Sequence, residues 1–134
     1  MNISEVTVNM LTDLMNESLE CLISHMTHDI AQCFFHHIFQ VLVHLESQIS
    51  FLIYQDVKSA NILFKLLSDE NYLFQLDDFS LCNNAMNAVT CCGTIIFAAP
   101  KVFTRATQTV KMDIWSLFVM MIYVWNVNDF RMKN

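Results

Sequence analysis

Three polar side chains stand close together in an otherwise apolar stretch of the sequence. They are Asp56, Lys58 and Asn61, and apolar runs flank them at residues 51–53 and 62–64. A carboxylate can accept the proton of a hydroxyl group, an amine can pair with a phosphate, and an amide oxygen can ligate a hard cation. Together the three side chains supply the parts for chemistry on a hydroxyl, a phosphate and a metal ion.

A second acidic group lies further along the chain. Asp77 and Asp78 follow the apolar segment 72–76 and precede Phe79. A carboxylate at this point could hold a divalent cation, because hard cations take oxygen ligands. The alternative is a solvated acidic turn at the end of a strand, and the two residues taken alone favour that alternative.

Two long helices and a β-hairpin are expected to position these side chains. Residues 30–47 carry apolar side chains at three- and four-residue intervals, which predicts an amphipathic helix. The apolar segments 62–67 and 72–76 flank the turn-forming residues 68–71 and predict a β-hairpin. Residues 112–124 are apolar nearly all round and predict a buried helix. The expected apolar face of the first helix consists of Ile30, Phe34, Ile38, Val41, Leu42 and Leu45.

The N-terminal part is expected to be less regular. Residues 6–11 alternate partly and predict a short strand, and residues 13–19 predict a connector. Either Ser18 or Asn16 could cap the short helix that follows. The polar residues 80–89 predict a mobile loop.

Composition narrows the class of protein. The chain has 134 residues, enough for one domain with a core. It is 54% apolar and 15% charged, against about 25% charged in ordinary soluble domains, which suits a piece of something larger. The net charge of −6 and the absence of a Lys/Arg cluster argue against a nucleic-acid partner.

Targeting and membrane segments are not expected. Nothing at the N-terminus resembles a signal peptide. The longest apolar run, residues 117–125, is shorter than the roughly 20 residues that span a bilayer. We therefore expect an intracellular, cytoplasmic protein with no membrane partner.

The cysteines are expected to be reduced, because five of them occur without a secretory signal. Cys21, His25, His28 and Cys33 could be drawn as a zinc cluster. They lack the Cys-x-x-Cys pairs that make zinc sites specific, so incidental core or surface residues are the favoured interpretation.

The first polar group resembles the protein-kinase catalytic loop, H-R-D-L-x-x-x-N. Asp56 matches the catalytic base and Asn61 the metal ligand, whereas Tyr54 and Gln55 replace the His and the Arg. The second group resembles the D-F-G site. There Asp78 and Phe79 match and Ser80 replaces the glycine, which is expected to restrict a backbone flip.

Two later segments follow in the family's order. Residues 93–101 resemble the G-T-x-x-Y/F-x-A-P-E end of a kinase activation segment, with Lys101 in place of the glutamate. Residues 113–118 resemble the D-x-W-S-x-G start of the family's central helix, with Phe118 in place of the glycine. The resemblance implies that Asp113 accepts hydrogen bonds from backbone amides of the catalytic loop.

The chain thus resembles a eukaryotic-type protein kinase domain. The implied fold class is α+β, a mainly helical partial C-lobe with a small β-hairpin and with the N-lobe largely absent. Residues 1–17 correspond to the end of the N-lobe and the hinge, and residues 18–134 to the C-lobe through the central helix. Lys58 and the Gly93-Thr94 pair favour the Ser/Thr type.

The resemblance also implies a reaction, the transfer of a phosphoryl group from ATP to a Ser or Thr of a protein substrate. Asp56 would accept the substrate hydroxyl proton, Lys58 would steady the γ-phosphate, and Asn61 and Asp78 would hold Mg²⁺. The residues implied in binding ATP are Asp13, Met15, Lys58, Asn61 and Asp78.

Several departures bear on activity. Gly93 is the only glycine, so the sequence contains no G-x-G-x-x-G loop, and it contains no V-A-I-K lysine. An active kinase needs that lysine and its glutamate partner. Gln55 cannot pair with a phosphate as a charge, and Tyr54 is expected to weaken the contacts that order the loop. A kinase and a catalytically inactive kinase-like fragment, or pseudokinase acting as a binding module, both stay open, and the isolated chain is expected to have little or no activity.

Overall fold

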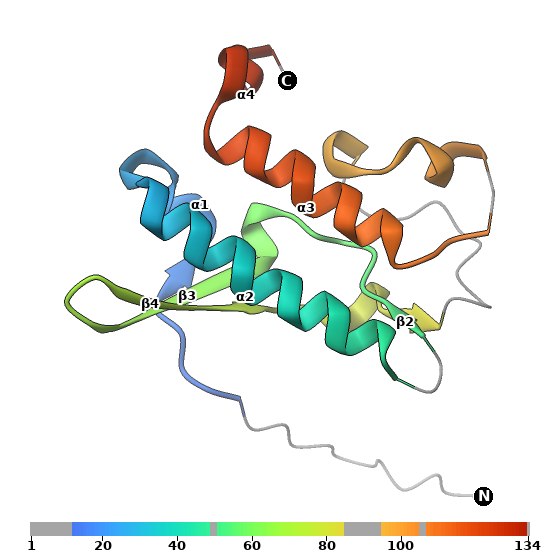
Figure 1. The fold of residues 1–134 in the computed structure, drawn as a ribbon, viewed down its shortest axis with the longest axis horizontal. Helices are drawn as coiled ribbons and strands as arrows, with labels where there is room; N and C mark the ends of the chain where they lie inside the picture. Colours follow the sequence, from blue (N-terminus) through green and yellow to red (C-terminus); the bar gives the residue numbers. More distant parts are fainter. Residues whose placement is uncertain (1–11, 49–50, 85–94, 105–106, 134) are drawn as a thin grey trace, which may run out of the picture.

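The computed structural model describes residues 12–48, 51–84, 95–104 and 107–133. Within these ranges a layer of helices packs on a small antiparallel sheet, which confirms the α+β class (Figure 1). The strand predicted at residues 6–11 and the Gly93-Thr94 pair lie outside the described residues.

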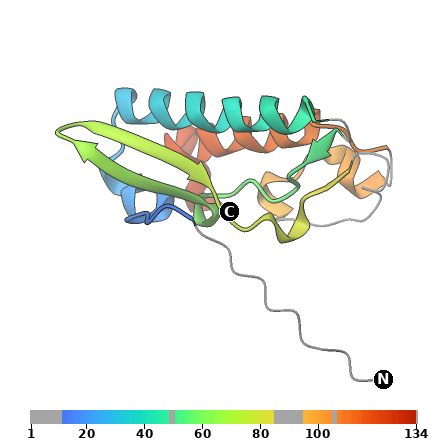
Figure 2. The same cartoon turned by 90° about the horizontal axis from the view of Figure 1, so that it is seen from below.

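The longest helix, α2 (His28–Glu46), lies beside α3 (Lys111–Val124), and the two run in opposite directions (Figures 1 and 2). Thr27 caps α2, because its side-chain oxygen accepts a hydrogen bond from the backbone N–H of Ile30 at 3.3 Å. The helix predicted at residues 30–47 is therefore confirmed, with a slightly earlier start. The buried residues of its face are Ala31, Phe34, Ile38, Leu42 and Leu45.

The predicted hairpin is present as strands β3 (Ile62–Ser68) and β4 (Asn71–Leu76), paired antiparallel with Phe64 opposite Phe74. The turn between them places Glu70 in the left-handed region, at φ 66°. The apolar side chains of the two strands give the helices a surface to pack on.

The connector before α1 (Leu19–Leu22) joins the sheet. Strand β1 (Glu17–Ser18) pairs with β3, so the strand order is β1-β3-β4. Ser18 occupies the N-cap position of α1 without a side-chain hydrogen bond. Asn16 is not a cap, because its side-chain oxygen accepts a hydrogen bond from the backbone N–H of Leu66 at 2.9 Å.

A second, two-stranded sheet lies at the N-terminal end of the segment that contains Asp56. Strand β2 (Leu52–Ile53) pairs antiparallel with β5 (Asn83–Asn84). The start of the loop predicted at residues 80–89 is therefore regular, with a 3₁₀ turn at Phe79–Leu81 before β5. Residues 85–89 lie outside the described part of the chain.

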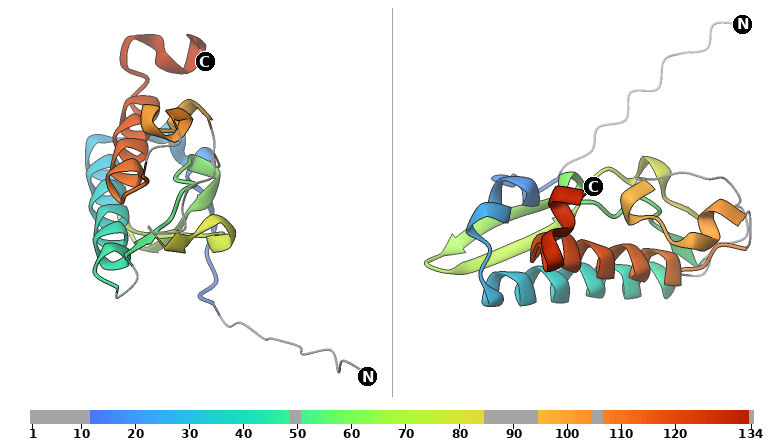
Figure 3. Two further views of the ribbon diagram at one scale, coloured as in Figure 1. Left: turned by 90° about the vertical axis from the view of Figure 1, so that its right-hand side faces the viewer. Right: turned by 90° about the horizontal axis from the view of Figure 1, so that it is seen from above.

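The hydrophobic core lies between α2, α3 and the hairpin (Figure 3). Phe34 of α2 packs edge-to-face on Phe74 of β4, with ring centroids 5.9 Å apart. Each buried side chain of this size contributes about 1.5–3 kcal/mol. The most buried members of the core include Leu19, Phe34, Ile38, Leu42, Tyr54, Ile62, Leu117 and Met120.

Helix α3 is less buried than its sequence predicts. Trp115 and Phe118 are 44% and 58% exposed. One face of the helix packs on α2, and another contacts the 3₁₀ turn Ile95–Phe97, where Phe97 lies edge-to-face on Tyr123. Side chains between these two faces, Trp115 and Phe118 among them, remain in contact with solvent.

The chain continues beyond α3 into a turn and the short helix α4 (Phe130–Lys133). Of the helices in the described part of the chain, none combines the length and apolar character that crossing a membrane requires.

Candidate active site

The segment between β2 and β3 carries the first group of predicted site residues. Tyr54 and Val57 anchor the backbone of this segment, because their side chains are buried in the core. Asn61 ends the segment in a 3₁₀ turn, Ser59–Asn61, immediately before β3 begins. A rigid core on one side and a strand on the other therefore set the position of the polar residues between them.

Asp56 is the centre of a small polar network. The side-chain amide of Asn61 donates to the Asp56 backbone oxygen at 3.0 Å and to its carboxylate Oδ2 at 2.9 Å. The Lys58 ammonium lies 3.3 Å from the same carboxylate oxygen. Asp56 and Asn61 are buried, whereas Lys58 is partly exposed. The structure thus brings together the three residues that the sequence singled out and fixes the direction of the Asp56 carboxylate.

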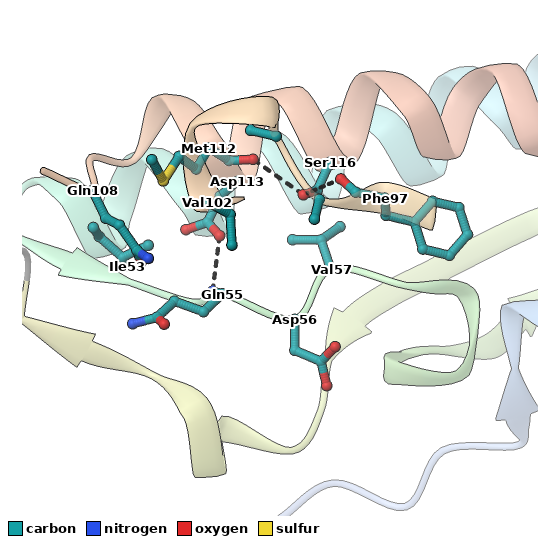
Figure 4. Close-up of a pocket in the computed structure, with 12 residues that line it drawn as sticks. Ile53, Gln55, Asp56, Val57, Phe97, Val102, Gln108, Met112, Asp113 and Ser116 are labelled. Atoms are coloured by element: carbon teal, nitrogen blue, oxygen red, sulfur yellow. Dashed lines mark hydrogen bonds between the residues drawn. The ribbon is translucent and has the colours of Figure 1, made fainter. Parts of the chain in front are cut away.

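Asp113, at the start of α3, accepts hydrogen bonds from the backbone of this segment. Its two carboxylate oxygens accept hydrogen bonds from the backbone N–H groups of Tyr54, at 2.7 Å, and Gln55, at 2.8 Å. The bond to Gln55 is drawn in Figure 4. These are the contacts that the resemblance implied. They support a left-handed backbone at Gln55, with φ 73°, a conformation that costs a non-glycine residue free energy.

Burial makes Asp113 an unusual carboxylate. Removal from water raises its pKa from 3.8 to about 6, although the backbone hydrogen bonds from Gln55 and Tyr54 act in the opposite direction. The carboxylate is therefore ionised at neutral pH and takes up a proton in mildly acidic solution.

Tyr54 links the segment to the second acidic group. Its hydroxyl donates a hydrogen bond to the backbone oxygen of Asp77, and its ring lies edge-to-face on Phe79 with centroids 5.2 Å apart. Burial, and then the negative charges of nearby aspartates, raise the pKa of the Tyr54 phenol above its usual value, so the group stays a donor. The tyrosine side chain therefore ties the two segments together, and the expectation that it orders the loop less well than histidine stays a prediction.

Asp78 adopts the left-handed conformation at φ 56° and ψ 78°. Its carboxylate accepts a hydrogen bond from the backbone N–H of Ser80 at 3.2 Å. The side-chain hydroxyl of Ser80 is the main cause that lowers the pKa of Asp78, this backbone hydrogen bond is the next, and the charge of Lys58 adds to the effect. Positive φ thus falls on Asp78, and Ser80 lies in a 3₁₀ turn, so serine is accommodated in this conformation.

A cleft of about 510 Å³ opens beside Asp78. It brings together three predicted ATP-binding residues, Asp13, Met15 and Asp78, from segments far apart in the sequence. Lys58 and Asn61 do not line it. They adjoin it, because the Asp77 backbone N–H donates to the Asn61 backbone oxygen at 2.8 Å and Lys58 influences Asp78 electrostatically. The residues that line the cleft are Thr12, Asp13, Met15, Leu63, Gln75, Leu76, Asp77, Asp78, Phe79 and Ser80.

A much smaller cavity, about 20 Å³, lies behind Asp56 and Gln55 (Figure 4). It is about the size that holds one water molecule. Gln108, buried at its edge, was not a sequence candidate, because a lone glutamine in a polar stretch carries no signal of burial. Ser116 donates to the backbone oxygen of Phe97 at 2.7 Å and so fastens α3 to the neighbouring 3₁₀ turn.

Comparison with known proteins decides the family. The family model described as "Protein kinase domain" matches residues 2–132. The chain belongs to this family. The family assignment agrees with the catalytic-loop, D-F-G, A-P-E and central-helix resemblances in the sequence.

Kinase-domain relatives match parts of the chain. The serine/threonine-protein kinase shk1/pak1 of Schizosaccharomyces pombe is 37% identical over 75 residues, which is 53% of this chain and 11% of that protein. The serine/threonine-protein kinase ste20 of Aspergillus fumigatus is 42% identical over 85 residues, 60% of this chain and 10% of that protein. The maternal embryonic leucine zipper kinase of Xenopus tropicalis is 32% identical over 102 residues, 72% of this chain and 15% of that protein. The kinase-domain chain thus spans a small part of the curated relatives it matches.

The metal-ligand candidates of this kinase domain are an amide and a carboxylate. Asp78 is exposed at the cleft and accepts one backbone hydrogen bond, which leaves acceptor capacity for a cation. The Asn61 amide nitrogen is directed at Asp56. Such a set fits Mg²⁺, which binds through one or two protein oxygen ligands together with phosphates and water. Within the described residues, no group of three or more His, Cys, Asp or Glu side chains is placed to hold a metal ion. This includes Cys21, His25, His28 and Cys33, which the sequence offered as a zinc cluster.

Proposed function

We propose that this kinase domain binds ATP with Mg²⁺ in the cleft beside Asp78. The observation that carries the proposal is the convergence of Asp13, Met15 and Asp78 on one cleft of about 510 Å³. That volume is within the roughly 300–1,000 Å³ of pockets that hold cofactors. The adenine would contact the backbone of residues 13–15, and the phosphates would extend toward Asp78. We further propose that residues 1–17 correspond to the end of the kinase N-lobe and the hinge, and that residues 18–134 correspond to the C-lobe through the central helix.

The proposed reaction is phosphoryl transfer from ATP to a Ser or Thr hydroxyl of a protein substrate. Asp56 suits the role of proton acceptor, because Asn61 and Lys58, which adjoin the cleft, fix the direction of its carboxylate. The charge of Lys58 lowers the pKa of Asp78, and we assign its ammonium the role of pairing with a phosphate bound beside Asp78. Asn61 and Asp78 would hold Mg²⁺, which neutralises phosphate charge when bound.

A second candidate is a nucleotide-binding domain without transfer activity. It is favoured by the single glycine of the sequence, which leaves no Gly-rich loop to cover the phosphates, and by the lack of a V-A-I-K lysine. Phosphoryl transfer depends on positioning and charge stabilisation. We therefore expect the 134-residue chain by itself to bind ATP with Mg²⁺ and to transfer phosphate slowly or not at all.

Thermal unfolding tests the binding proposal. A ligand that binds only the folded state raises stability by about 2.7 kcal/mol at a concentration 100 times its dissociation constant. We expect ATP with Mg²⁺ to raise the melting temperature and Asp78→Asn to reduce the rise. Asp69→Asn, an exposed aspartate in the hairpin turn, is the matched control. An equal rise in all three proteins, or no rise in the wild-type chain, would contradict binding beside Asp78.

Incubation with radiolabelled ATP, Mg²⁺ and a generic protein acceptor separates the two candidates. Transfer that is lost in Asp56→Ala would establish the kinase and refute the inactive domain. Nucleotide-induced stabilisation without any transfer would establish the binding domain.

A further inference from the structure

An apolar groove shares no lining residue with the proposed ATP cleft. It has a volume of about 330 Å³ and runs between the 3₁₀ turn Pro100–Thr104 and the first turns of α3. Met112 and Trp115 form part of its wall, and Trp115 is 44% exposed. An exposed tryptophan beside a groove is typical of a protein interface rather than of free surface.

The groove carries positive charge. Lys101 and Lys111 both line it and both are exposed. The described part of the chain contains one ion pair, Lys58 with Asp56, so neither groove lysine has a carboxylate partner there. Lys111 is also the first residue of α3, where a positive charge is unfavourable next to the positive end of the helix dipole. An acidic segment with an apolar side chain would complement this surface.

The chain itself presents such a segment at the tip of the β3–β4 hairpin. Leu66 and Leu67 are 49% and 59% exposed, and Asp69 and Glu70 follow them in the turn, also exposed. The hairpin tip projects from one end of the molecule, whereas α3 begins at the other end (Figures 1 and 2). The tip therefore cannot reach the groove of its own chain.

One other exposed site where apolar and acidic residues adjoin has a different shape. Asp77, Asp78 and Phe79 line the concave ATP cleft, so they do not protrude. The hairpin tip differs from them in both shape and position.

We propose that the groove binds the hairpin tip of a second copy of this chain. Leu66 and Leu67 would pack on Trp115 and Met112, while Asp69 and Glu70 would pair with Lys101 and Lys111. This contact joins unlike surfaces at opposite ends of the molecule, so it either repeats head to tail or forms twice in an antiparallel pair. Because the contact area is small and the charges lie at its rim, the association is weak and sensitive to salt.

Sedimentation velocity of the full chain over a range of concentrations tests the proposal. We expect the weight-average sedimentation coefficient to rise with concentration at low salt and to rise less at high salt. The double variant Lys101→Glu/Lys111→Glu and the double variant Asp69→Lys/Glu70→Lys should each lose about tenfold or more in association constant, because two attractions become repulsions. Mixing the two variants should restore association, since each acidic surface then meets a basic one.

The control is Arg131→Glu/Lys133→Glu, which makes the same change in net charge on α4, away from the groove. It should associate like the wild-type chain. Circular dichroism of every variant establishes that it is folded, and the four positions reversed in the groove and in the hairpin tip are exposed. A wild-type chain that stays monomeric, a control that also loses association, or a mixture that does not re-associate would each overturn the proposal.

Discussion

Replacement of Asp113 by asparagine should change how the stability of the chain depends on pH. The carboxylate is 1% exposed and accepts hydrogen bonds from the backbone N–H groups of Tyr54 and Gln55. Asparagine has nearly the same shape but does not titrate. Its amide nitrogen would face one of the two backbone donors and leave it unpaired, which costs about 1–3 kcal/mol at every pH.

The pH dependence comes from the shifted pKa of Asp113. Its pKa is about 6 in the folded chain, against a usual value of 3.8. Between these values the folded state binds more protons than the unfolded state, so stability falls as pH rises. The contribution is fully present below pH 3.8 and is lost above pH 6. It amounts to about 3 kcal/mol in total, of which roughly 2 kcal/mol is lost between about pH 4.5 and 7.5.

Urea unfolding followed by tryptophan fluorescence measures this contribution as a difference between two proteins. The stability of the wild-type chain minus that of Asp113→Asn should fall by about 2 kcal/mol from about pH 4.5 to 7.5. Subtraction removes the titration of groups that both proteins share. Asp69→Asn serves as the control for the same substitution at the surface. A difference that is independent of pH, or that grows with pH, would refute the assignment of Asp113 as a desolvated carboxylate.

Three further substitutions probe the contacts that shape the site and the core. Tyr54→Phe removes the hydroxyl that donates to Asp77 and should cost about 1 kcal/mol in urea unfolding. Asn61→Ala leaves the Asp56 carboxylate without its amide donor; we expect a loss of about 1–3 kcal/mol and a smaller melting-temperature rise with ATP and Mg²⁺. Phe34→Ala opens a cavity against the hairpin and should cost about 3–5 kcal/mol in urea unfolding. The controls are Tyr72→Phe, at a half-buried tyrosine, and Asn71→Ala and Phe39→Ala, at exposed positions, and a control as costly as its partner would contradict the packing described.

The parts of the fold that could be predicted from sequence are those with a strong local signal. Helix α2 has a long apolar period, and the hairpin has two apolar runs around a polar turn, so local preference and burial agree. The two-residue strands β1 and β5 have no such signal. They form because the backbone N–H and C=O groups at the edges of β3 and β2 need hydrogen-bond partners, which the adjacent segments supply.

Helix α3 shows the limit of reasoning from composition. Its apolar residues predicted burial all round, yet Trp115 and Phe118 are exposed, because sequence does not indicate which faces neighbouring elements cover. The same limit applies to the site. Spacing identified Asp56, Lys58 and Asn61, but the role of the Tyr54 hydroxyl depends on where the Asp77 carbonyl lies, which is a contact between distant segments.

The most direct test of the account is the location of bound nucleotide. Nuclear magnetic resonance of the isotope-labelled chain with ATP and Mn²⁺ in place of Mg²⁺ reports it, because the paramagnetic ion broadens the signals of nearby amides. We expect selective broadening at residues 13–15 and 75–80, beyond that caused by Mn²⁺ without ATP, while the hairpin tip at residues 69–70 stays sharp. Signals at residues 13–15 and 75–80 that remain sharp with ATP and Mn²⁺, or broadening centred elsewhere, would contradict an ATP site beside Asp78.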